Sequence, residues 1–285
     1  MQTTAYAKIN WALNLTGKRP DGYHLLNMLM QPIALHDDLT LTPRTDGRIR
    51  LTLEGAPGLA ADETNLACRA ASALRSAVRD AALGVDIHLV KRIPSGAGLG
   101  GGSADAAAVL HGLNRLWDLG LTDEYLQAIG LTLGADVPFC VYGRPAQVTG
   151  IGEVISPLLM ARSFPLVLLH PCAPLPTRQV FETADTVAFA VPADIEQARS
   201  AFASGQPSGI AAHCRNMLQP AAALLRPELP GALCDLTAAG AFLAMMTGSG
   251  SVVFGAFETD ALADAACKRL SETYPVCIRT HTLPG

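Results

Sequence analysis

The sequence contains few aromatic and charged residues and has no long apolar run, and these absences exclude several classes of protein. Of its 285 residues, 5% are aromatic and 16% charged, whereas 49% are hydrophobic. Such a chain can bury a large core and is not intrinsically disordered. No apolar run approaches the ~20 residues of a membrane-spanning helix, and the start, MQTTAYAKINW, lacks the pattern of a signal peptide. We therefore expect a cytoplasmic protein without a membrane partner.

The cysteines lack the spacing of a disulfide framework or a zinc site. There are seven, dispersed along the chain, and none forms a C-x-x-C pair. We expect reduced, mostly buried thiols. The net charge of −4 gives no broad basic surface, so we expect no nucleic-acid partner. A few local cations could still hold one small anionic ligand.

Glycine is concentrated in one segment, RIPSGAGLGGGSADAAAVL, residues 92–110. Five of the seven positions from 96 to 102 are glycine, and an alanine-rich run that favours helix follows. We expect Ser103 to be the N-cap of that helix. Glycine lets a ligand approach the backbone closely, and a helix start presents unpaired N–H groups and the positive end of the dipole. The segment is therefore typical of a phosphate-binding site.

Other interpretations of this segment are weaker. Gly96-x-Gly98-x-x-Gly101 matches the dinucleotide fingerprint of dehydrogenases, but the buried strand and βαβ unit that would give the match meaning are missing. A Walker P-loop needs Gly-Lys-Ser/Thr, whereas Gly102 directly precedes Ser103. A flexible surface loop remains an alternative, although a linker would not run straight into so strong a helix.

The hydrophobic pattern predicts an α+β protein of two lobes that meet near residues 157–163. In the first lobe we expect strands at 5–15, 38–43, 49–53 and 85–92, helices at 65–78, 103–117 and 122–133, and short strands around 139–148. In the second we expect strands at 164–171, 242–247, 251–257 and 276–281, and helices at 194–203, 219–226, 229–239 and 258–272.

The segment from Pro94 to Ser103 resembles the second motif of the GHMP kinases, a superfamily that includes galactokinase and the homoserine, mevalonate and phosphomevalonate kinases. AKIN at 7–10 resembles the first motif, and TGSGSVVF at 247–254 the third. The resemblance implies an N-terminal domain at 1–160 like domain 2 of ribosomal protein S5, a ferredoxin-like C-terminal domain at 161–285, and ATP with Mg²⁺.

Two more segments specify the branch of the superfamily. GKRPDGYHLLNMLMQ at 17–31 and LTLGADVPFC at 131–140 closely resemble the branch whose substrate is CDP-methylerythritol, in the non-mevalonate isoprenoid pathway. The resemblance implies ATP-dependent phosphorylation of the 2-hydroxyl of that substrate.

The resemblance makes Lys8 and Asp136 the catalytic pair. A carboxylate can align or deprotonate an attacking hydroxyl, and a nearby ammonium stabilises developing negative charge. The alternatives are an ordinary helix N-cap for Asp136 and a strand lysine that reaches solvent for Lys8.

The resemblance also assigns the binding residues. Tyr23 and His24 would read the cytidine by stacking and hydrogen bonding, and Asn10 would contact the methylerythritol. Thr177 and Phe181 would close over the cytosine, with Phe181 opposite Tyr23. The alternatives are an exposed turn for Tyr23 and His24, and a helix-start threonine and a core phenylalanine for Thr177 and Phe181.

ATP would be held by the glycine segment and the adenine pocket. The residues assigned to it are Pro94, Ser95, Gly96, Ala97, Gly98, Leu99, Gly100, Gly101, Gly102 and Ser103 for the phosphates, and Asn65, Leu66 and Lys91 around adenine. The third motif, with Thr247, Gly248, Ser249 and Gly250, would form a second glycine turn near the active site. Asn65 could instead be a helix N-cap. Ser103 is a candidate Mg²⁺ contact, and Asp105 could simply favour the first turn of its helix.

One segment departs from the family pattern. The family's Asn-Asp-Leu-Glu reads Asn216-Met217-Leu218-Gln219 here, and we expect a changed surface or helix cap there. A homoserine- or mevalonate-type kinase and a catalytically silent nucleotide sensor stay open as alternatives, with an S5-like RNA-binding module more distant. We expect a monomer or weak homodimer.

Overall fold

The computed structural model describes residues 1–187 and 191–285, which form helices and strands in mixed order. The strands are β1 (Gln2–Lys18), β2 (His24–Arg44), β3 (Ile49–Glu54), β4 (Gly84–Val90), β5 (Ala146–Gly150), β6 (Val154–Pro157), β7 (Pro165–Leu169), β8 (Leu243–Met246), β9 (Val253–Ala256) and β10 (Cys277–His281). The helices are α1 (Leu66–Val78), α2 (Gly101–Leu116), α3 (Asp123–Leu133), α4 (Val137–Tyr142), α5 (Thr177–Ala184), α6 (Ile195–Ser204), α7 (Pro207–His213), α8 (Gln219–Leu225), α9 (Glu228–Ala238) and α10 (Asp260–Leu270).

The chain folds into two compact units that interleave in sequence. The first comprises Met1–Lys8, Leu35–Pro94 and Gly100–Gly143, and the second Ile9–Ala34, Ser95–Leu99 and Arg144–Gly285. The long strands β1 and β2 contribute to both units. The domain boundary near residue 160 stays a prediction.

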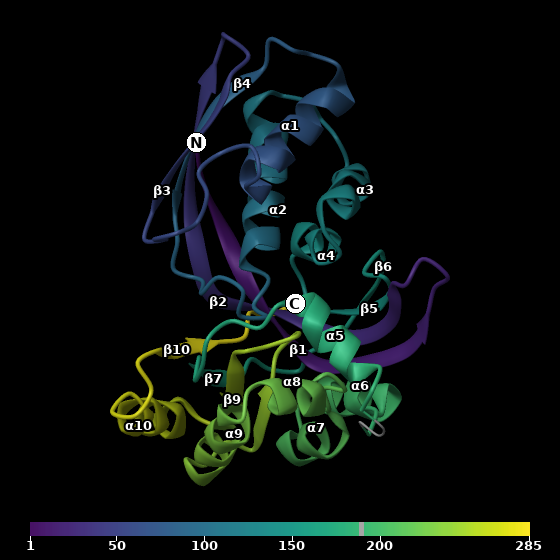
Figure 1. Ribbon diagram of the computed structural model, residues 1–285, viewed down its shortest axis with the longest axis vertical. Helices are drawn as coiled ribbons and strands as arrows, with labels where there is room; N and C mark the ends of the chain where they lie inside the picture. The colour runs from purple at the N-terminus through teal and green to yellow at the C-terminus, as the bar shows by residue number, and fades with distance from the viewer. Residues whose placement is uncertain (188–190) are drawn as a thin grey trace. The chain divides into compact units, whose positions relative to one another are not determined.

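In the first unit, two helices cover one face of a mixed sheet. β4 pairs antiparallel with the Asp38–Arg44 part of β2 and parallel with β3. The side chains of Val85, Ile87 and Leu89 alternate along β4 and are buried in one core with residues of α1 and α2, which lie side by side (Figure 1). Because most residues of α2 that face this core are alanines, the backbones can approach closely. This packing holds α2 against α1 and the sheet.

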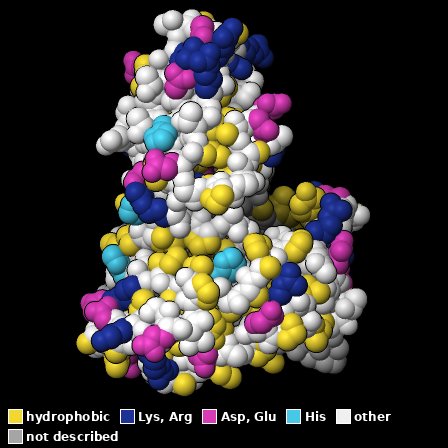
Figure 2. Space-filling view, turned by 60° about the vertical axis from the view of Figure 1, so that its left-hand side comes forward, with side chains coloured by type: hydrophobic (Ala, Val, Ile, Leu, Met, Phe, Trp, Pro, Cys, Tyr) yellow, Lys and Arg dark blue, Asp and Glu magenta, His cyan; other side chains and the backbone are white. Residues whose placement is uncertain are grey.

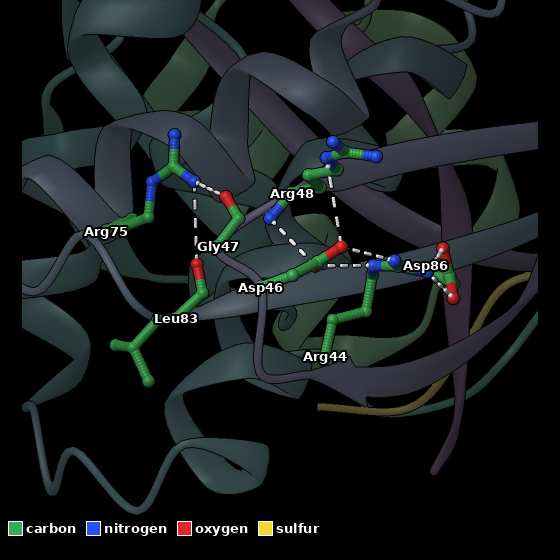
Figure 3. A network of polar contacts seen from close by, with 7 residues as sticks. All are labelled: Arg44, Asp46, Gly47, Arg48, Arg75, Leu83 and Asp86. Atoms are coloured by element: carbon green, nitrogen blue, oxygen red, sulfur yellow. Dashed lines mark hydrogen bonds and ion pairs between the residues drawn. The ribbon is translucent and has the colours of Figure 1, made fainter.

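A polar network ties together the chain around the β2–β3 turn (Figure 3). The Arg44 guanidinium binds the carboxylates of Asp46 and Asp86, with N–O distances of 2.6 and 2.8 Å. The hydrogen bond from Arg44 holds the pKa of Asp46 well below its usual range. Arg75 of α1 donates to the carbonyl oxygens of Gly47 and Leu83. The network joins α1 to the end of the sheet.

The second unit contains an antiparallel sheet with strand order β10-β7-β9-β8. Helices separate β7 from β8 and β9 from β10, so the chain follows the β-α-β-β-α-β path of a ferredoxin-like fold, as the sequence predicts. The fully buried Trp11 packs edge-on against Phe164, Phe202 and Phe254 at ring-centroid distances of 5.2–5.8 Å. Its indole N–H donates to Gln31 at 2.7 Å, which satisfies its one polar atom.

The predicted helices are confirmed to within two residues at each end, but some elements differ from the prediction. The short strands expected around 139–148 are partly wrong, because α4 occupies Val137–Tyr142 and β5 begins only at Ala146. Pro138 favours the first turn of a helix, and this was the available signal. The helices α5 and α7 were not predicted.

The surface drawn in Figure 2 carries lysine and arginine side chains in small groups, most of them beside aspartate or glutamate. Not one helix in the described part of the chain combines the length and the apolar character that a membrane span requires.

Candidate active site

Lys8 and Asp136 form an ion pair in the first unit. Lys8 Nζ lies 3.3 Å from Asp136 Oδ2, and the side chains are 4% and 32% exposed. Asp136 occupies the N-cap position of α4, but its side chain makes no capping hydrogen bond. The two alternatives, a lysine that reaches solvent and a capping aspartate, therefore do not describe this pair.

The glycine segment begins α2 earlier than predicted. The N-cap is Gly100, with φ of +70°, and the helix starts at Gly101, so the prediction of Ser103 as N-cap is wrong. Glycine adopts this left-handed conformation without strain and lets the helix begin before the serine. A Cβ on Gly100 would lie 3.0 Å from Lys8 Cγ, so the glycine also leaves room for the lysine. The N–H groups of the first turn have no partner within the helix and can bind an anion.

The three motifs meet in the second unit at Thr247. The Thr247 hydroxyl accepts a hydrogen bond from the Asn10 backbone N–H at 3.1 Å and lies 3.3 Å from the Gly98 carbonyl oxygen. A Cβ on Gly98 would approach the Thr247 carbonyl oxygen to 2.2 Å, a distance that no side chain tolerates. The sequence predicted these motifs, and the structure packs them together.

The segment 216–219 is partly buried: Asn216 and Leu218 are buried, whereas Met217 and Gln219, which depart from the family pattern, are half-buried. Asn216 is 6% exposed, and its amide donates to the carbonyl oxygens of Met246 and Gly248 at 2.8 and 2.9 Å. Gln219 Oε1 accepts from the Met246 N–H at 2.9 Å. The expected change of surface or helix cap concerns Met217 and Gln219 and stays a prediction; both are half-buried, and Gln219 begins α8. Through the hydrogen bonds of Asn216 and Gln219, the segment supports the third glycine motif. Its role was missed because only the long-range contacts reveal it.

His24, rather than Tyr23, packs against Phe181 in the second unit. The ring centroids of His24 and Phe181 are 5.0 Å apart with an interplanar angle of 37°. Tyr23 is 62% exposed and follows a turn closed by the Gly22 N–H donating to Arg19. Thr177 begins α5, and its hydroxyl lies 2.9 Å from that of Ser249.

Lys91 belongs to a buried ionic cluster in the first unit. Its ammonium lies 2.5 Å from Asp37 Oδ2 and 2.7 Å from Asp105 Oδ2, and all three side chains are at most 4% exposed. Asp37 Oδ1 accepts the backbone N–H groups of Arg92 and Ile93. The cluster thus anchors the chain just before the glycine segment to the first turns of α2. The sequence did not identify Asp37, and Asp105 does more than favour the helix start.

Asn65 is the N-cap of α1, as the alternative held. Its side chain accepts from the Ala67 N–H at 3.0 Å and donates to the Ala60 carbonyl oxygen at 2.9 Å. Adenine binding by Asn65, Leu66 and Lys91 stays a prediction.

The Asp105 carboxyl gives the free energy of unfolding a specific pH dependence. Burial, the largest cause, raises its pKa to about 7, with Lys91 opposing and Asp37 adding to the shift. The folded chain therefore holds this proton more tightly than the unfolded chain, whose aspartate has a pKa near 3.9. The stabilisation that the proton provides is complete below pH ~4 and is lost as the pH rises through ~7.

We expect Asp105→Asn, which retains a neutral side chain, to remove this dependence. Urea unfolding from pH 5 to pH 8 should show the variant gaining stability over the wild type by about 2–3 kcal/mol as the pH rises. Glu272→Gln, at an exposed position, is the control and should follow the wild-type profile. Parallel profiles for Asp105→Asn and the wild type would contradict the assignment.

Comparison with known proteins agrees with the arrangement of motifs. The models of the GHMP kinases N-terminal and C-terminal domains match residues 65–144 and 198–276. The 4-diphosphocytidyl-2-C-methyl-D-erythritol kinase of Moorella thermoacetica is 44% identical over 98% of both chains, and that of Rhizobium johnstonii is 43% identical over 94% of this chain and 88% of the relative.

The solved structures include relatives of the same kind and more distant ones. A crystal structure of 4-(cytidine 5'-diphospho)-2C-methyl-D-erythritol kinase superposes over the full length of both chains with a TM-score of 0.85 and 36% identity. The homoserine kinase from Cytophaga hutchinsonii has a TM-score of 0.78 at 17% identity, covering all of this chain and 94% of that one, and shares the fold alone. The chain thus belongs to the 4-diphosphocytidyl-2-C-methyl-D-erythritol kinase family of the GHMP kinases.

Proposed function

We propose that this kinase transfers the γ-phosphoryl group of ATP to the 2-hydroxyl of 4-diphosphocytidyl-2-C-methylerythritol. The observation that carries the proposal is the Lys8–Asp136 pair beside Gly100. A protein that only binds a nucleotide has no need for a buried lysine held against a partly exposed carboxylate.

The pair divides the chemistry between two charges. The Asp136 carboxylate accepts the hydrogen bond of the acceptor hydroxyl and orients its oxygen toward the γ-phosphorus. The Lys8 ammonium stabilises the negative charge that spreads over the transferring group. At ~4 Å and an effective dielectric constant of ~20, two such charges attract each other by about 4 kcal/mol before desolvation. Lys8 therefore also holds Asp136 in place.

The glycine segment would hold the ATP phosphates through backbone N–H groups at the start of α2. Among the described residues, no group of three or more histidine, cysteine, aspartate and glutamate side chains is placed to hold a metal ion. The residues of the glycine segment fit Mg²⁺ that arrives with ATP, because phosphate and water supply most of the ligands of this ion. Ser103, in the first turn of α2, would supply a hydroxyl. The ion would neutralise phosphate charge.

The second unit would bind the acceptor. The exposed Tyr23 ring offers a stacking surface for cytosine, and base–aromatic stacking contributes ~1–3 kcal/mol in nucleic-acid binders. His24 and Phe181 form the adjoining aromatic pair. Asn10 would contact the methylerythritol, and Thr177 would lie at the cytosine end. Cytoplasmic location and a monomeric or weakly dimeric state stay predictions.

The test offers the purified protein Mg·ATP with CDP-methylerythritol, homoserine or mevalonate, and follows ADP release. We expect turnover with the cytidyl substrate alone. Turnover only with homoserine or mevalonate would overturn the substrate assignment. Tight ATP binding without turnover of any alcohol would favour a nucleotide sensor.

A further inference from the structure

Asp185 lies where the end of α5 meets His24 in the second unit. It follows Phe181 by four residues, and its backbone N–H donates to the Phe181 carbonyl oxygen at 3.1 Å. Residues four apart share one face of a helix. The same end of α5 therefore presents the Phe181 ring and the Asp185 carboxylate to His24.

Each oxygen of Asp185 has its own partner. Oδ1 lies 2.7 Å from His24 Nε2, and Oδ2 lies 2.5 Å from Lys18 Nζ. The His24 side chain is only 11% exposed, whereas Lys18 and Asp185 are 47% and 38% exposed. The hydrogen bonds from Lys18 and then His24 hold the pKa of Asp185 below its usual range, so the carboxylate is ionised at neutral pH.

An ionised carboxylate can only accept hydrogen bonds, and this fixes the proton on the His24 ring. Nε2 must carry a hydrogen to bond with Asp185, so in the neutral imidazole Nδ1 is left as an acceptor. Phe181 restrains the ring from the side. The histidine is thus held in one orientation with one free acceptor.

Cytosine and uracil differ at the atom that such an acceptor distinguishes. Cytosine carries an amino group at position 4, which donates, whereas uracil carries a carbonyl oxygen, which only accepts. In a site that offers a hydrogen-bond acceptor, the carbonyl oxygen of uracil would face that acceptor, and neither group would have a hydrogen to share. Polar groups left without a partner in this way weaken binding.

We infer that Asp185 is a positioning residue that fixes the tautomer of His24 and thereby makes the acceptor site prefer an amino-bearing pyrimidine over a keto-bearing one. The inference rests on the proposed function, because it takes His24 as a base-reading residue. It adds a residue, Asp185, that the sequence motifs do not contain.

The experiment compares the wild type with Asp185→Asn, using CDP-methylerythritol and its uridyl analogue as acceptors. The asparagine amide can donate to Nε2 and so allow the other tautomer. We expect the ratio of kcat/KM values, cytidyl over uridyl, to fall about tenfold, the effect of about one hydrogen bond. The change should lie in KM, with kcat at saturating cytidyl substrate retained within about twofold. Glu182→Gln, which removes an exposed carboxylate from the same helix, is the matched control and should keep the wild-type ratio.

A spectroscopic readout tests the tautomer directly. The protein is labelled with ¹⁵N, and the His24 signals are assigned by comparison with a His24→Gln spectrum. In the wild type we expect His24 to carry its proton on Nε2 and not on Nδ1. In Asp185→Asn the tautomer population of His24 should shift toward Nδ1–H. An unchanged substrate ratio, or a wild-type His24 with the proton on Nδ1, would overturn the inference. Absence of turnover with both acceptors would instead refute the proposed function. In that case the role of Asp185 would still be decided by the affinities for CDP and UDP, measured by calorimetry, together with the spectrum.

Discussion

Asp136→Asn is expected to lower kcat by about 10²–10⁴-fold, the usual contribution of a positioned acid–base group. Asparagine has nearly the same shape, so the site should stay intact while the charge that orients the acceptor hydroxyl is lost. The 3.3 Å contact with Lys8 would also weaken, because an amide attracts an ammonium less than a carboxylate does. Steady-state kinetics with saturating Mg·ATP and cytidyl substrate measure the effect.

The matched control for this variant is Asp123→Asn. Asp123 is also an aspartate at a helix start in the first unit, but its side chain is 61% exposed. Its replacement should leave kcat within about twofold of the wild type, since surface substitutions have small effects. Unfolding temperatures of both variants identify any loss of structure. A near-normal kcat for a folded Asp136→Asn would remove Asp136 from the mechanism.

Local pattern was enough to predict most of the fold. Alternation along 85–92 gave β4, whose inward residues are buried, and the alanine run after residue 103 gave α2. The pattern failed where two preferences compete. The segment 137–142 is apolar enough for a strand, but Pro138 and the left-handed Gly143 bound a short helix instead. Strand β2 runs through the polar residues at 36–38, which interrupted the alternation that would have predicted its full length.

The candidate site was predictable wherever a motif is contiguous in sequence. Lys8, Asp136 and the glycine segment were identified in this way, and the first two lie in contact. The supporting residues were not predictable, because their roles depend on partners far along the chain. Asp37 is 54 residues from Lys91, and Asp185 is 161 residues from His24. An isolated aspartate gives no signal in one sequence until the fold brings its partner near.

Gly98→Ala is expected to lower kcat/KM for ATP by at least about 100-fold, because displacing a reactive group by ~1 Å can cost that much. The added Cβ would lie 2.2 Å from the Thr247 carbonyl oxygen and 3.1 Å from the Gly250 nitrogen. Both are backbone atoms, so the collision cannot be relieved by rotating a side chain. The glycine segment must therefore move away from the third motif and lose its phosphate-binding geometry.

The control must separate this collision from backbone strain, because Gly98 also has φ of +77° and a left-handed alanine costs roughly 1–2 kcal/mol. Gly120→Ala provides the control: φ is +62°, and a Cβ there would meet nothing within 4 Å. It should lose stability by a similar strain energy in urea unfolding but keep wild-type kcat/KM. Equal activity of the two folded variants would mean that contact between the second and third motifs does not position the phosphates. Loss of activity in Gly98→Ala alone would assign that role to the contact between Gly98 and Thr247.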